Sequence, residues 1–428
     1  MARKNIEINS SHPLVAIDMG HAMRAMAAER DEKGLLRVLG VEWSGKTTYT
    51  ERGVVTNTSG ASFCVNEILK LLANRIHCDN LTKAFVPLGG RSMKIVEVTS
   101  KRNQLQKKTI PDSLLDAMEK ECKQKIEERN PAVAVLGLVP SVYVLDGVEQ
   151  KDVPSPEQEA QWVSVTYIAF VGKKELEQKV KDCFIRIPKR VEHMYARPDA
   201  LMCALASAED LHVGCAILDM GAQTTTLTVY KGNKYVYNRV VSQGGYDITR
   251  DIEQLGMSFA YAERLKCDYG CASAELLTKN NVYRIPNPMV EGGVTLVKSN
   301  ELCDVIANRL NQILEPLMSD LNNLGESIGV LYITGGASML NGAEAYVQGK
   351  TEIPVMYGSH APWLTEDTPD EYCAPNYTSL VGTLLLGGFY RDMHPEQVHE
   401  DALMKRLKET IKKVEKQTLI VFSDTQTE

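Results

Sequence analysis

The sequence predicts a two-lobed α/β fold made of two similar halves. One apolar run ends at Asp219, passes through a turn that contains Gly and Thr, and re-enters a β-prone run near Thr226, which indicates two strands joined by a phosphate-sized turn. Near the N-terminus, the letters from Val15 to Gly20 repeat almost the same pattern around Asp18. A chain of 428 residues also exceeds what one hydrophobic core usually holds. We therefore expect two half-domains that face each other across a cleft, each presenting one carboxylate and one set of turn amides.

The composition is that of an ordinary globular protein. Apolar residues make up 44% and charged residues 24% of the chain, and no apolar run reaches the roughly 18 residues of a membrane-spanning helix. Neither a signal peptide nor a spanning helix is therefore expected. The net charge of −7 argues against a dedicated nucleic-acid-binding protein. Ten scattered cysteines, with one close pair at Cys267 and Cys271, indicate reduced and mostly buried thiols.

The first half begins with three short apolar runs, at residues 14–17, 23–28 and 35–42, whose spacing suits an antiparallel meander. An amphipathic helix is predicted over residues 62–77, because its apolar residues recur at helical spacing. These apolar residues are Val65, Ile68, Leu69, Leu72 and Ile76.

An inserted subdomain is predicted between residues 84 and 168. Strand character resumes over residues 84–98, a charged helix follows at 111–130, and further strand regions cover 131–145 and 162–171. This β-α-β-β order indicates a small unit of its own.

The remaining elements continue the alternation of helices and strands. Helices are expected over residues 174–187, 197–208, 247–255, 260–266, 300–324 and 377–389, and strands over 234–241, 282–298 and 329–333. The helix at 300–324 is the longest, and its apolar residues recur at helical spacing.

Two carboxylates at the ends of apolar strands are the first candidate ligands. Asp18 and Asp219 could together hold a Mg²⁺ through its waters, as hard oxygen ligands do. A single Asp in such a place more often starts a turn, but its duplication favours the metal. The Gly221 amide and the hydroxyls of residues 224–226 offer donors to phosphate, although Thr226 and Thr228 could simply face outward in a hairpin. The Gly335-Gly336 pair would let the backbone approach a flat ring or a ribose, although such a pair alone is weak support.

A second phosphate-binding pattern occurs at residues 40–47, which match the P-loop spacing G-x-x-x-x-G-K-[ST] letter for letter. Its context argues against that interpretation. Glu42 would put negative charge beside the phosphates, and residues 48–55 form no amphipathic helix whose N-terminus could face them. A hairpin turn at Ser44 and Gly45 is favoured instead, and Lys46→Ala is expected to leave nucleotide binding almost unchanged.

Six motifs follow one another along the chain in a particular order. They are Asp18-x-Gly20, Asp219-x-Gly221 through Thr225, Ser242 to Asp251, Ala262 to Lys266, Thr334 to Ala337 and Ser379 to Gly382. Their order and spacing resemble the actin/Hsp70-like ATPases, and more narrowly the FtsA family of bacterial cell-division proteins. The insert at residues 84–168 falls where that family carries its extra subdomain. The resemblance covers nearly the whole chain and implies an actin-like (ribonuclease H-like) two-lobed fold with an FtsA-type inserted subdomain.

Carried over position by position, the resemblance implies a bound ATP with Mg²⁺. The nucleotide-binding positions would be Asp18, Gly20, Asp219, Gly221, Thr224, Thr225, Gly244, Gly245, Glu263, Lys266, Gly335, Gly336 and Ala337. Asp18 and Asp219 would face the Mg²⁺ through its waters. Glu263 and Lys266, one helical turn apart, would meet the ribose and adenine. Without the surrounding motif, this pair would equally well be a surface ion pair.

Departures from the family pattern favour binding over hydrolysis. His21 stands where the first turn usually has a hydroxyl residue, and Ala222 and Gln223 replace two glycines of the second turn. Thr226 and Arg197 stand where the family often has acids, which would help orient the attacking water. We expect slow ATP hydrolysis at most, and Arg197→Glu with Thr226→Asp to raise the rate.

The resemblance also sets the expected domain boundaries. The first lobe would combine residues 1–83, 169–208 and 371–392, and the insert would cover 84–168. The second lobe would have a core of residues 209–250 and 300–370, an outer subdomain of 251–299, and a tail of 393–428 behind it.

The implied function is that of a polymerising adaptor that links the tubulin-like FtsZ ring to the cytoplasmic face of the cell membrane at the division site. The implied partners are the C-terminal peptide of FtsZ, received around residues 247–298, further copies of the chain, and membrane lipid, with no nucleic acid. Two alternatives stay open: a pilus-assembly or chaperone relative of the same fold, and a sugar-kinase-like enzyme.

The C-terminal residues 401–422 lack Gly and Pro and have the periodicity of an amphipathic helix. At about 100° per residue, one quadrant collects Leu403, Met404, Leu407, Ile411, Val414, Val421 and Phe422. Most of the lysines of this stretch fall outside that quadrant. Such a helix could lie in a membrane interface with its lysines drawn to anionic lipid, or dock its apolar stripe on the body or on a second copy.

Overall fold

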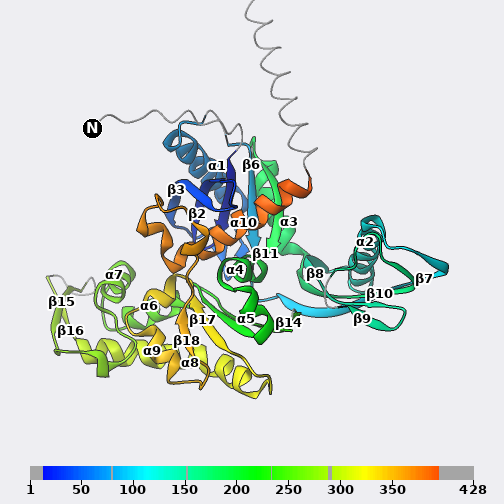
Figure 1. Ribbon diagram of the computed structural model, residues 1–428. Coiled ribbons are helices and arrows are strands. Elements are labelled where there is room, and N and C mark those ends of the chain that lie inside the picture. The colour runs from blue at the N-terminus through cyan, green and yellow to red at the C-terminus, as the bar shows by residue number, and fades with distance from the viewer. Residues whose placement is uncertain (1–12, 79–80, 151–152, 233, 288–291, 395–428) are drawn as a thin grey trace, which may run out of the picture.

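The computed structural model describes residues 13–78, 81–150, 153–232, 234–287 and 292–394 (Figure 1). Within them, two lobes lie one above the other in the view of Figure 1, and a smaller third part lies beside them. The helices among these residues include none that is long and apolar enough to cross a membrane. The predicted membrane-facing residues Leu403, Met404, Leu407, Ile411, Val414 and Phe422 lie outside the described residues.

Each lobe is built on a five-stranded sheet, and the two sheets share one topology. Their strand orders are β11-β6-β1-β2-β3 and β14-β13-β12-β17-β18. In each sheet the first three strands in chain order form an antiparallel meander, and the first strand also pairs in parallel with the fourth. Asp18 pairs with Arg24 in one meander and Asp219 with Thr226 in the other. The predicted two-lobed α/β fold is thereby confirmed.

The first lobe contains the first meander and the helices around it. Its strands are β1 (Leu14–Met19), β2 (Ala22–Arg30), β3 (Leu36–Lys46), β4 (Thr50–Glu51), β5 (Val54–Val55), β6 (Lys83–Leu88) and β11 (Arg190–Ala196). Its helices are α1 (Thr58–Arg75), α3 (Lys174–Ile185), α4 (Arg197–Leu205) and α10 (Thr378–Met393).

Strand β1 divides its side chains between two layers, because successive residues of a strand point to opposite faces. Val15 and Ile17 belong to the core that includes residues of α1 and α3. Leu14 and Ala16 belong to the core that includes residues of α10. Helix α1 begins after Asn57, whose side chain accepts a hydrogen bond from the Gly60 amide at 2.9 Å.

The second lobe repeats this arrangement. Its strands are β12 (Cys215–Met220), β13 (Thr225–Lys231), β14 (Lys234–Val241), β15 (Val282–Pro286), β16 (Val294–Lys298), β17 (Val330–Thr334) and β18 (Val355–Tyr357). Its helices are α5 (Ala208–Val213), α6 (Gly245–Glu253), α7 (Phe259–Tyr269), α8 (Ser299–Asn323) and α9 (Ala343–Gln348). The predicted long helix at 300–324 corresponds to α8, which continues through Pro316.

Strand β12 joins the cores of the two lobes. Ala216 and Leu218 belong to the second-lobe core with residues of α6 and α8. Cys215 and Ile217, on the opposite face of the strand, belong to the large first-lobe core together with Leu201 of α4. Burial of apolar surface is therefore continuous from one sheet to the other, and the ends of β1 and β12 are held at fixed positions.

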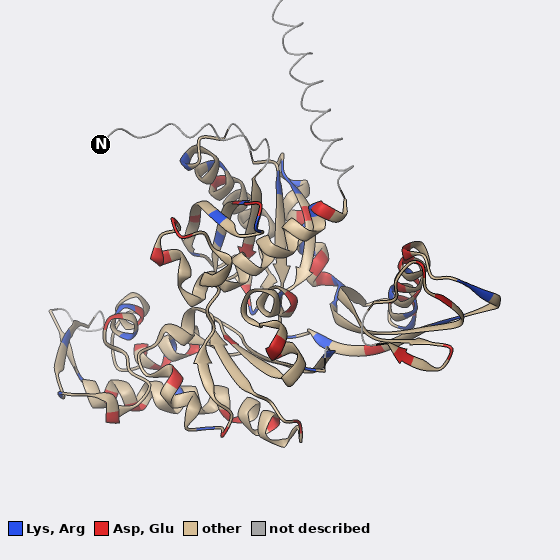
Figure 2. Ribbon diagram, viewed as in Figure 1, with Lys and Arg blue, Asp and Glu red and all other residues tan. Residues whose placement is uncertain are grey.

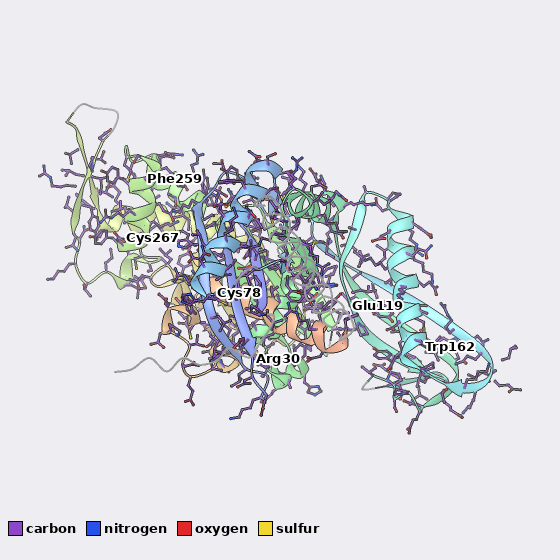
Figure 3. The ribbon with its side chains drawn as sticks, turned by 90° about the horizontal axis from the view of Figure 1, so that it is seen from above. Arg30, Cys78, Glu119, Trp162, Phe259 and Cys267 are labelled. Atoms are coloured by element: carbon purple, nitrogen blue, oxygen red, sulfur yellow. The ribbon has the colours of Figure 1, made fainter. Side chains whose placement is uncertain are left out.

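The inserted sheet has the order β7-β10-β8-β9 and is covered by one helix. Its elements are β7 (Lys94–Thr109), α2 (Asp112–Arg129), β8 (Val133–Leu145), β9 (Val148–Gln150) and β10 (Glu159–Lys173). Strand β6 was expected at the start of the insert, but it pairs with β1 and β11 in the first sheet. The inserted sheet therefore begins at Lys94. Seen from above in Figure 3, Glu119 and Trp162 of this part lie at the opposite end of the molecule from Phe259 and Cys267 of the second lobe.

The cysteines are reduced and mostly buried, as expected, and the charged residues are spread over the molecule. All ten cysteines lie within the described residues as free thiols, and Cys267 alone among them is exposed. Acidic and basic residues both occur on all three parts of the described chain (Figure 2).

The contact between α4 and α10 generates a stability prediction. A Cβ atom placed on Gly382 of α10 would lie 1.8 Å from the carbonyl oxygen of Ala200 in α4. Gly382→Ala must therefore push the two helices apart, and we expect it to lower the free energy of unfolding by about 1–3 kcal/mol or more. Urea denaturation measures this change.

The matched control is Gly349→Ala, at the end of α9. A Cβ there would meet its nearest neighbour at 3.5 Å, an ordinary contact. Equal losses of stability in the two variants would contradict the close helix contact at Gly382.

Candidate functional site

A cavity of about 470 Å³ lies between the two lobes, within the range of small-molecule sites in proteins. Residues of both meander turns, of α4, α6 and α7, and of the loop after β17 form its wall. It brings together eleven of the thirteen predicted nucleotide-binding residues: Asp18, Gly20, Asp219, Gly221, Thr224, Gly245, Glu263, Lys266, Gly335, Gly336 and Ala337. We call this cavity the interlobe cleft.

Thr225 and Gly244 are the two predicted residues that do not line the cleft. The Thr225 side chain is buried, and its hydroxyl donates to the carbonyl oxygen of Gln243 at 2.9 Å. A Cβ on Gly244 would lie 2.4 Å from the carbonyl oxygen of Gly221, so glycine here lets two wall loops touch. Both residues thus contact the loops that form the cleft wall without lining the cleft themselves.

The turn after β12 is closed by its own backbone. The Gly221 amide, predicted as a phosphate donor, instead donates to the carbonyl oxygen of Thr224 at 2.9 Å. That amide is therefore not available to a phosphate. The Gly221 carbonyl in turn accepts from the Gly245 amide at 3.0 Å, which ties the start of α6 to the turn.

The Gly335-Gly336 pair opens the wall for two different reasons. Gly335 has a φ of 88°, and a Cβ there would lie 2.5 Å from Oδ1 of Asp219, so this position requires glycine. At Gly336, a Cβ would meet only the Cβ of Asn376, at 4.0 Å. The surface at Gly336 is therefore open toward the cleft.

Arg197 lies between the two carboxylates that the sequence predicts as Mg²⁺ ligands. Its Nη2 donates to Oδ1 of Asp18, and its Nη1 is 3.8 Å from Oδ2 of Asp219. Burial raises the pKa of Asp219 to about 6, with a further rise from Asp18 that Arg197 opposes. Burial lowers the pKa of Arg197, but the two carboxylates outweigh it and leave that pKa raised. The guanidinium is thus the cation that neutralises this pair.

This donor set does not fit the expected hydrated Mg²⁺. A guanidinium has only N–H donors, so it cannot ligate a metal, and its positive charge repels one. The part of the chain that the structure describes contains no group of three or more His, Cys, Asp or Glu side chains poised to hold a metal ion. The sequence missed this arrangement because a strand-end carboxylate does not reveal which cation the fold brings to it.

A second charged cluster lies elsewhere on the cleft wall, around Glu263. Lys266 donates from Nζ to the carbonyl oxygen of Gly245 at 2.8 Å and to Oε2 of Glu263 at 2.9 Å. Lys46 of the first lobe reaches Oε1 of the same carboxylate at 2.8 Å. Although burial opposes it, the two lysines, with the Thr249 hydroxyl, hold the pKa of Glu263 at about 2. The Glu263–Lys266 pair is thus part of the cleft wall and of a bridge between the lobes.

The stretch at residues 40–47 forms neither a P-loop nor a hairpin turn. It lies mostly in β3, where the pairing with β2 shifts register between Ala22 and Arg24. Gly45 has a φ of 71° at this irregularity, which a residue with a side chain rarely adopts. The predicted turn at Ser44 and Gly45 is therefore a β-bulge. Because Lys46 follows it and lines the cleft, the expected indifference of the site to Lys46→Ala no longer follows.

Two residues that depart from the family pattern make contacts between the lobes. The His21 ring meets the Tyr246 ring edge-on, with centroids 5.2 Å apart. Burial, followed by the charge of Lys46, lowers the pKa of His21. Gln223 accepts at Oε1 from the Arg52 amide at 2.8 Å. Each of these two side chains therefore links its own turn to the opposite lobe.

Asp199, two residues after Arg197, is a partly buried acid outside the cleft wall. Its Oδ1 is buried without a hydrogen-bond partner, and a Cβ on Gly137 would lie 2.7 Å from its Oδ2. Burial raises the pKa of Asp199 to about 7, although a hydrogen bond with Tyr235 opposes the rise. The folded protein therefore holds the Asp199 proton more tightly than the unfolded chain does.

The raised pKa of Asp199 makes the folded protein less stable as pH rises. The contribution of Asp199 to stability is complete below the ordinary pKa of an aspartate and is lost as pH rises through about 7. We expect Asp199→Asn to remove a stability loss on the order of 2 kcal/mol between pH 5 and pH 8. Urea denaturation at both pH values measures it.

The matched control is Asp182→Asn, near the surface of α3, where the carboxylate accepts from Gln178 at 2.8 Å. This variant should keep the pH dependence of the wild type. If Asp199→Asn also keeps it, Asp199 is ionised in the folded protein throughout this range and the assignment is wrong.

Comparison with known families and proteins finds a likeness to the FtsA cell-division proteins. The family model "Cell division protein FtsA" matches residues 216–382. The cell division protein FtsA of Pseudomonas aeruginosa is 22% identical over 398 residues, which cover 89% of this chain and 90% of the relative. That of Neisseria meningitidis serogroup B is 25% identical over 220 residues, which cover 50% of this chain and 52% of the relative.

Solved structures show the same fold at lower identity. A chain of the PilM-PilN type IV pilus biogenesis complex superposes with a TM-score of 0.63 at 16% identity, covering 87% of this chain and 98% of that one. MreB5 of Spiroplasma citri bound to ADP superposes with a TM-score of 0.50 at 13% identity, covering 90% of this chain and 99% of that one. These likenesses establish the actin-like fold.

Proposed function

We propose, on the premise that this actin-like chain is a relative of the FtsA cell-division proteins, that it binds a nucleotide in the interlobe cleft and serves as an adaptor in bacterial division. The main support for nucleotide binding is that the two repeated Asp-x-Gly turns and the Gly335-Gly336 loop all line one cavity. MreB5, which shares the fold, was solved with ADP bound. Mg²⁺ is not part of this proposal, because Arg197 lies between Asp18 and Asp219.

The residues that line the interlobe cleft favour nucleotide binding without appreciable hydrolysis. Arg197 and Thr226 both line the cleft, at positions where an acid would orient the attacking water. Neither side chain can act as a base toward water at neutral pH. In this proposal the nucleotide orders the two lobes and so favours self-association of the chain into a filament.

The nucleotide proposal is tested by Gly336→Asp. The change puts a carboxylate where the wall is open to the cleft, so it should repel phosphate-bearing ligands and fill part of the adenosine pocket. We expect the dissociation constant of a fluorescent ATP analogue to rise at least about tenfold. Equilibrium titration of the purified protein measures it.

Gly232→Asp is the matched control, since it adds the same charge at a turn where a Cβ would meet nothing within 4 Å. Its φ of 57° is one that Asp tolerates. An unchanged affinity in Gly336→Asp, or an equal loss in both variants, would place the nucleotide elsewhere.

The division role gives the chain two further ligands, FtsZ and membrane lipid. For FtsZ, the outer part of the second lobe offers the hairpin of β15 and β16, at the far left of Figure 1. Val282, Val294 and Leu296 on this hairpin are 54%, 47% and 59% exposed, and Arg284 is paired with Leu296 across it. An extended apolar peptide with an acidic residue, such as a C-terminal tail, suits this surface. For lipid, the proposal rests on the amphipathic periodicity of residues 401–422, and lipid binding there would hold the chain at the cytoplasmic face of the membrane.

The two ligands can be separated in one co-sedimentation experiment with anionic vesicles and purified FtsZ. Wild-type protein should bring FtsZ down with the vesicles. Leu407→Glu with Ile411→Glu should release the protein from lipid, because the charges oppose insertion of the apolar stripe, while its affinity for the FtsZ peptide is unchanged. With Leu296→Glu, the protein should still sediment with the vesicles, but FtsZ should remain in the supernatant.

Each variant serves as the folding control of the other. Sedimentation that is unaffected by the Leu407 and Ile411 changes would give the C-terminal residues another role. FtsZ recruitment that survives Leu296→Glu would move the docking site away from the hairpin.

A further inference from the structure

The cleft holds a protein cation where the actin-like fold class leads one to expect a metal. The Arg197 guanidinium donates to Asp18 and approaches Asp219, and its side chain is 22% exposed, on the cleft side. We propose that Arg197 takes the place of Mg²⁺, so that this chain binds its nucleotide as the metal-free phosphate anion with Arg197 as the counter-charge. The inference rests on the proposed nucleotide site and names the ion chemistry of that site.

Packing holds the Arg197 side chain in place. A Cβ on Gly89 would lie 3.2 Å from Nε and 3.3 Å from Cδ of Arg197, so glycine at position 89 makes room for this rotamer. Arg197 is also the first residue of α4, and Pro198 follows it in the first turn of that helix. The backbone that carries the guanidinium is therefore anchored at the junction of the two lobes.

Electrostatic attraction to the two carboxylates also holds the Arg197 guanidinium in place. If it swung away, Asp18 and Asp219 would face each other without a cation, and Asp219 is buried. A Mg²⁺ that entered beside it would meet a positive charge and a group without acceptor atoms. Mg²⁺ also demands near-ideal octahedral oxygen coordination, which two carboxylates already bound to an arginine do not offer.

The same guanidinium is well suited to phosphate. Its planar array of N–H donors matches two phosphate oxygens at once, and it stays charged at any pH of interest. Of the other cations that line the cleft, Lys46 and Lys266 are both engaged by Glu263, and the Arg24 guanidinium lies over the Tyr377 ring, 5.9 Å from its centroid. Arg197 is therefore the cation whose removal should cost most phosphate affinity.

Titration of the full chain with a fluorescent ATP analogue, in EDTA and in excess MgCl₂, tests the inference. We expect wild-type dissociation constants in the two conditions to agree within about threefold. In EDTA, Arg197→Gln should weaken binding by about 10- to 100-fold, the range for a lost charge-assisted hydrogen bond. Adding MgCl₂ should restore part of the affinity of this variant, because the freed carboxylates can then hold a metal. Arg186→Gln, at the end of α3 with its guanidinium 3.4 Å from the Ser59 hydroxyl, is the matched control.

A second measurement uses Mn²⁺ alone, followed by electron paramagnetic resonance without nucleotide. Wild-type protein should bind no Mn²⁺ in the cleft, and Arg197→Gln should gain one site that Asp219→Asn removes. The wild-type arm needs no variant, so a misfolded Arg197→Gln would leave the test intact.

The outcomes separate the two claims. Wild-type binding that strengthens more than about tenfold with MgCl₂ would overturn the arginine inference and keep the nucleotide site. Wild-type Mn²⁺ binding that Asp219→Asn abolishes would do the same. Absence of analogue binding in both EDTA and MgCl₂ would refute the proposed nucleotide site itself.

Discussion

The ion cluster of Asp18, Arg197 and Asp219 is the interaction on which the rest of the cleft depends. Duplication of the half-domain brings two strand-end carboxylates to the same place, and two such groups in a buried site repel each other unless a cation lies between them. Here the cation comes from the protein itself. Because Asp18 and Arg197 belong to the first lobe and Asp219 to the second, the cluster also links the two lobes.

Two further contacts keep the lobes in that relation. Lys46 reaches across the cleft to Glu263, and Arg52 donates its amide to Gln223. Beneath them, β12 shares its two faces between the cores of both lobes. The apolar contact determines where the sheets sit, and the polar contacts at the wall link the two lobes beside the cleft.

Much of the fold followed from local pattern. The repeated strand, Asp and Gly around Asp18 and Asp219 predicted two matching sheets, because a strand and its turn are determined within a few residues. The long helix α8 was equally clear, since its apolar spacing persists over many turns. The start of the insert was misplaced, because β6 and β7 were both expected as strands and the sequence does not show which sheet each of them joins.

The sequence predicted most of the residues that line the site, but not the partners of their polar groups. Positions such as Gly336 and Lys266 followed from motif order, whereas the partner of each polar group depends on tertiary approach. Thr225 turned inward to Gln243, the Gly221 amide closed its own turn, and Lys46 entered the cleft from a β-bulge. Thr225 and Lys46 have partners far along the chain, Gln243 and Glu263, which a local pattern does not reveal.

A crystal structure of the protein grown with a non-hydrolysable ATP analogue and MnCl₂, with anomalous scattering recorded for manganese, would show which cation faces the phosphates in the interlobe cleft. We expect phosphate oxygens within hydrogen-bonding distance of the Arg197 guanidinium, and no manganese peak between Asp18 and Asp219. A manganese peak bridging the phosphates to those carboxylates, with Arg197 rotated out of the cleft, would contradict this expectation.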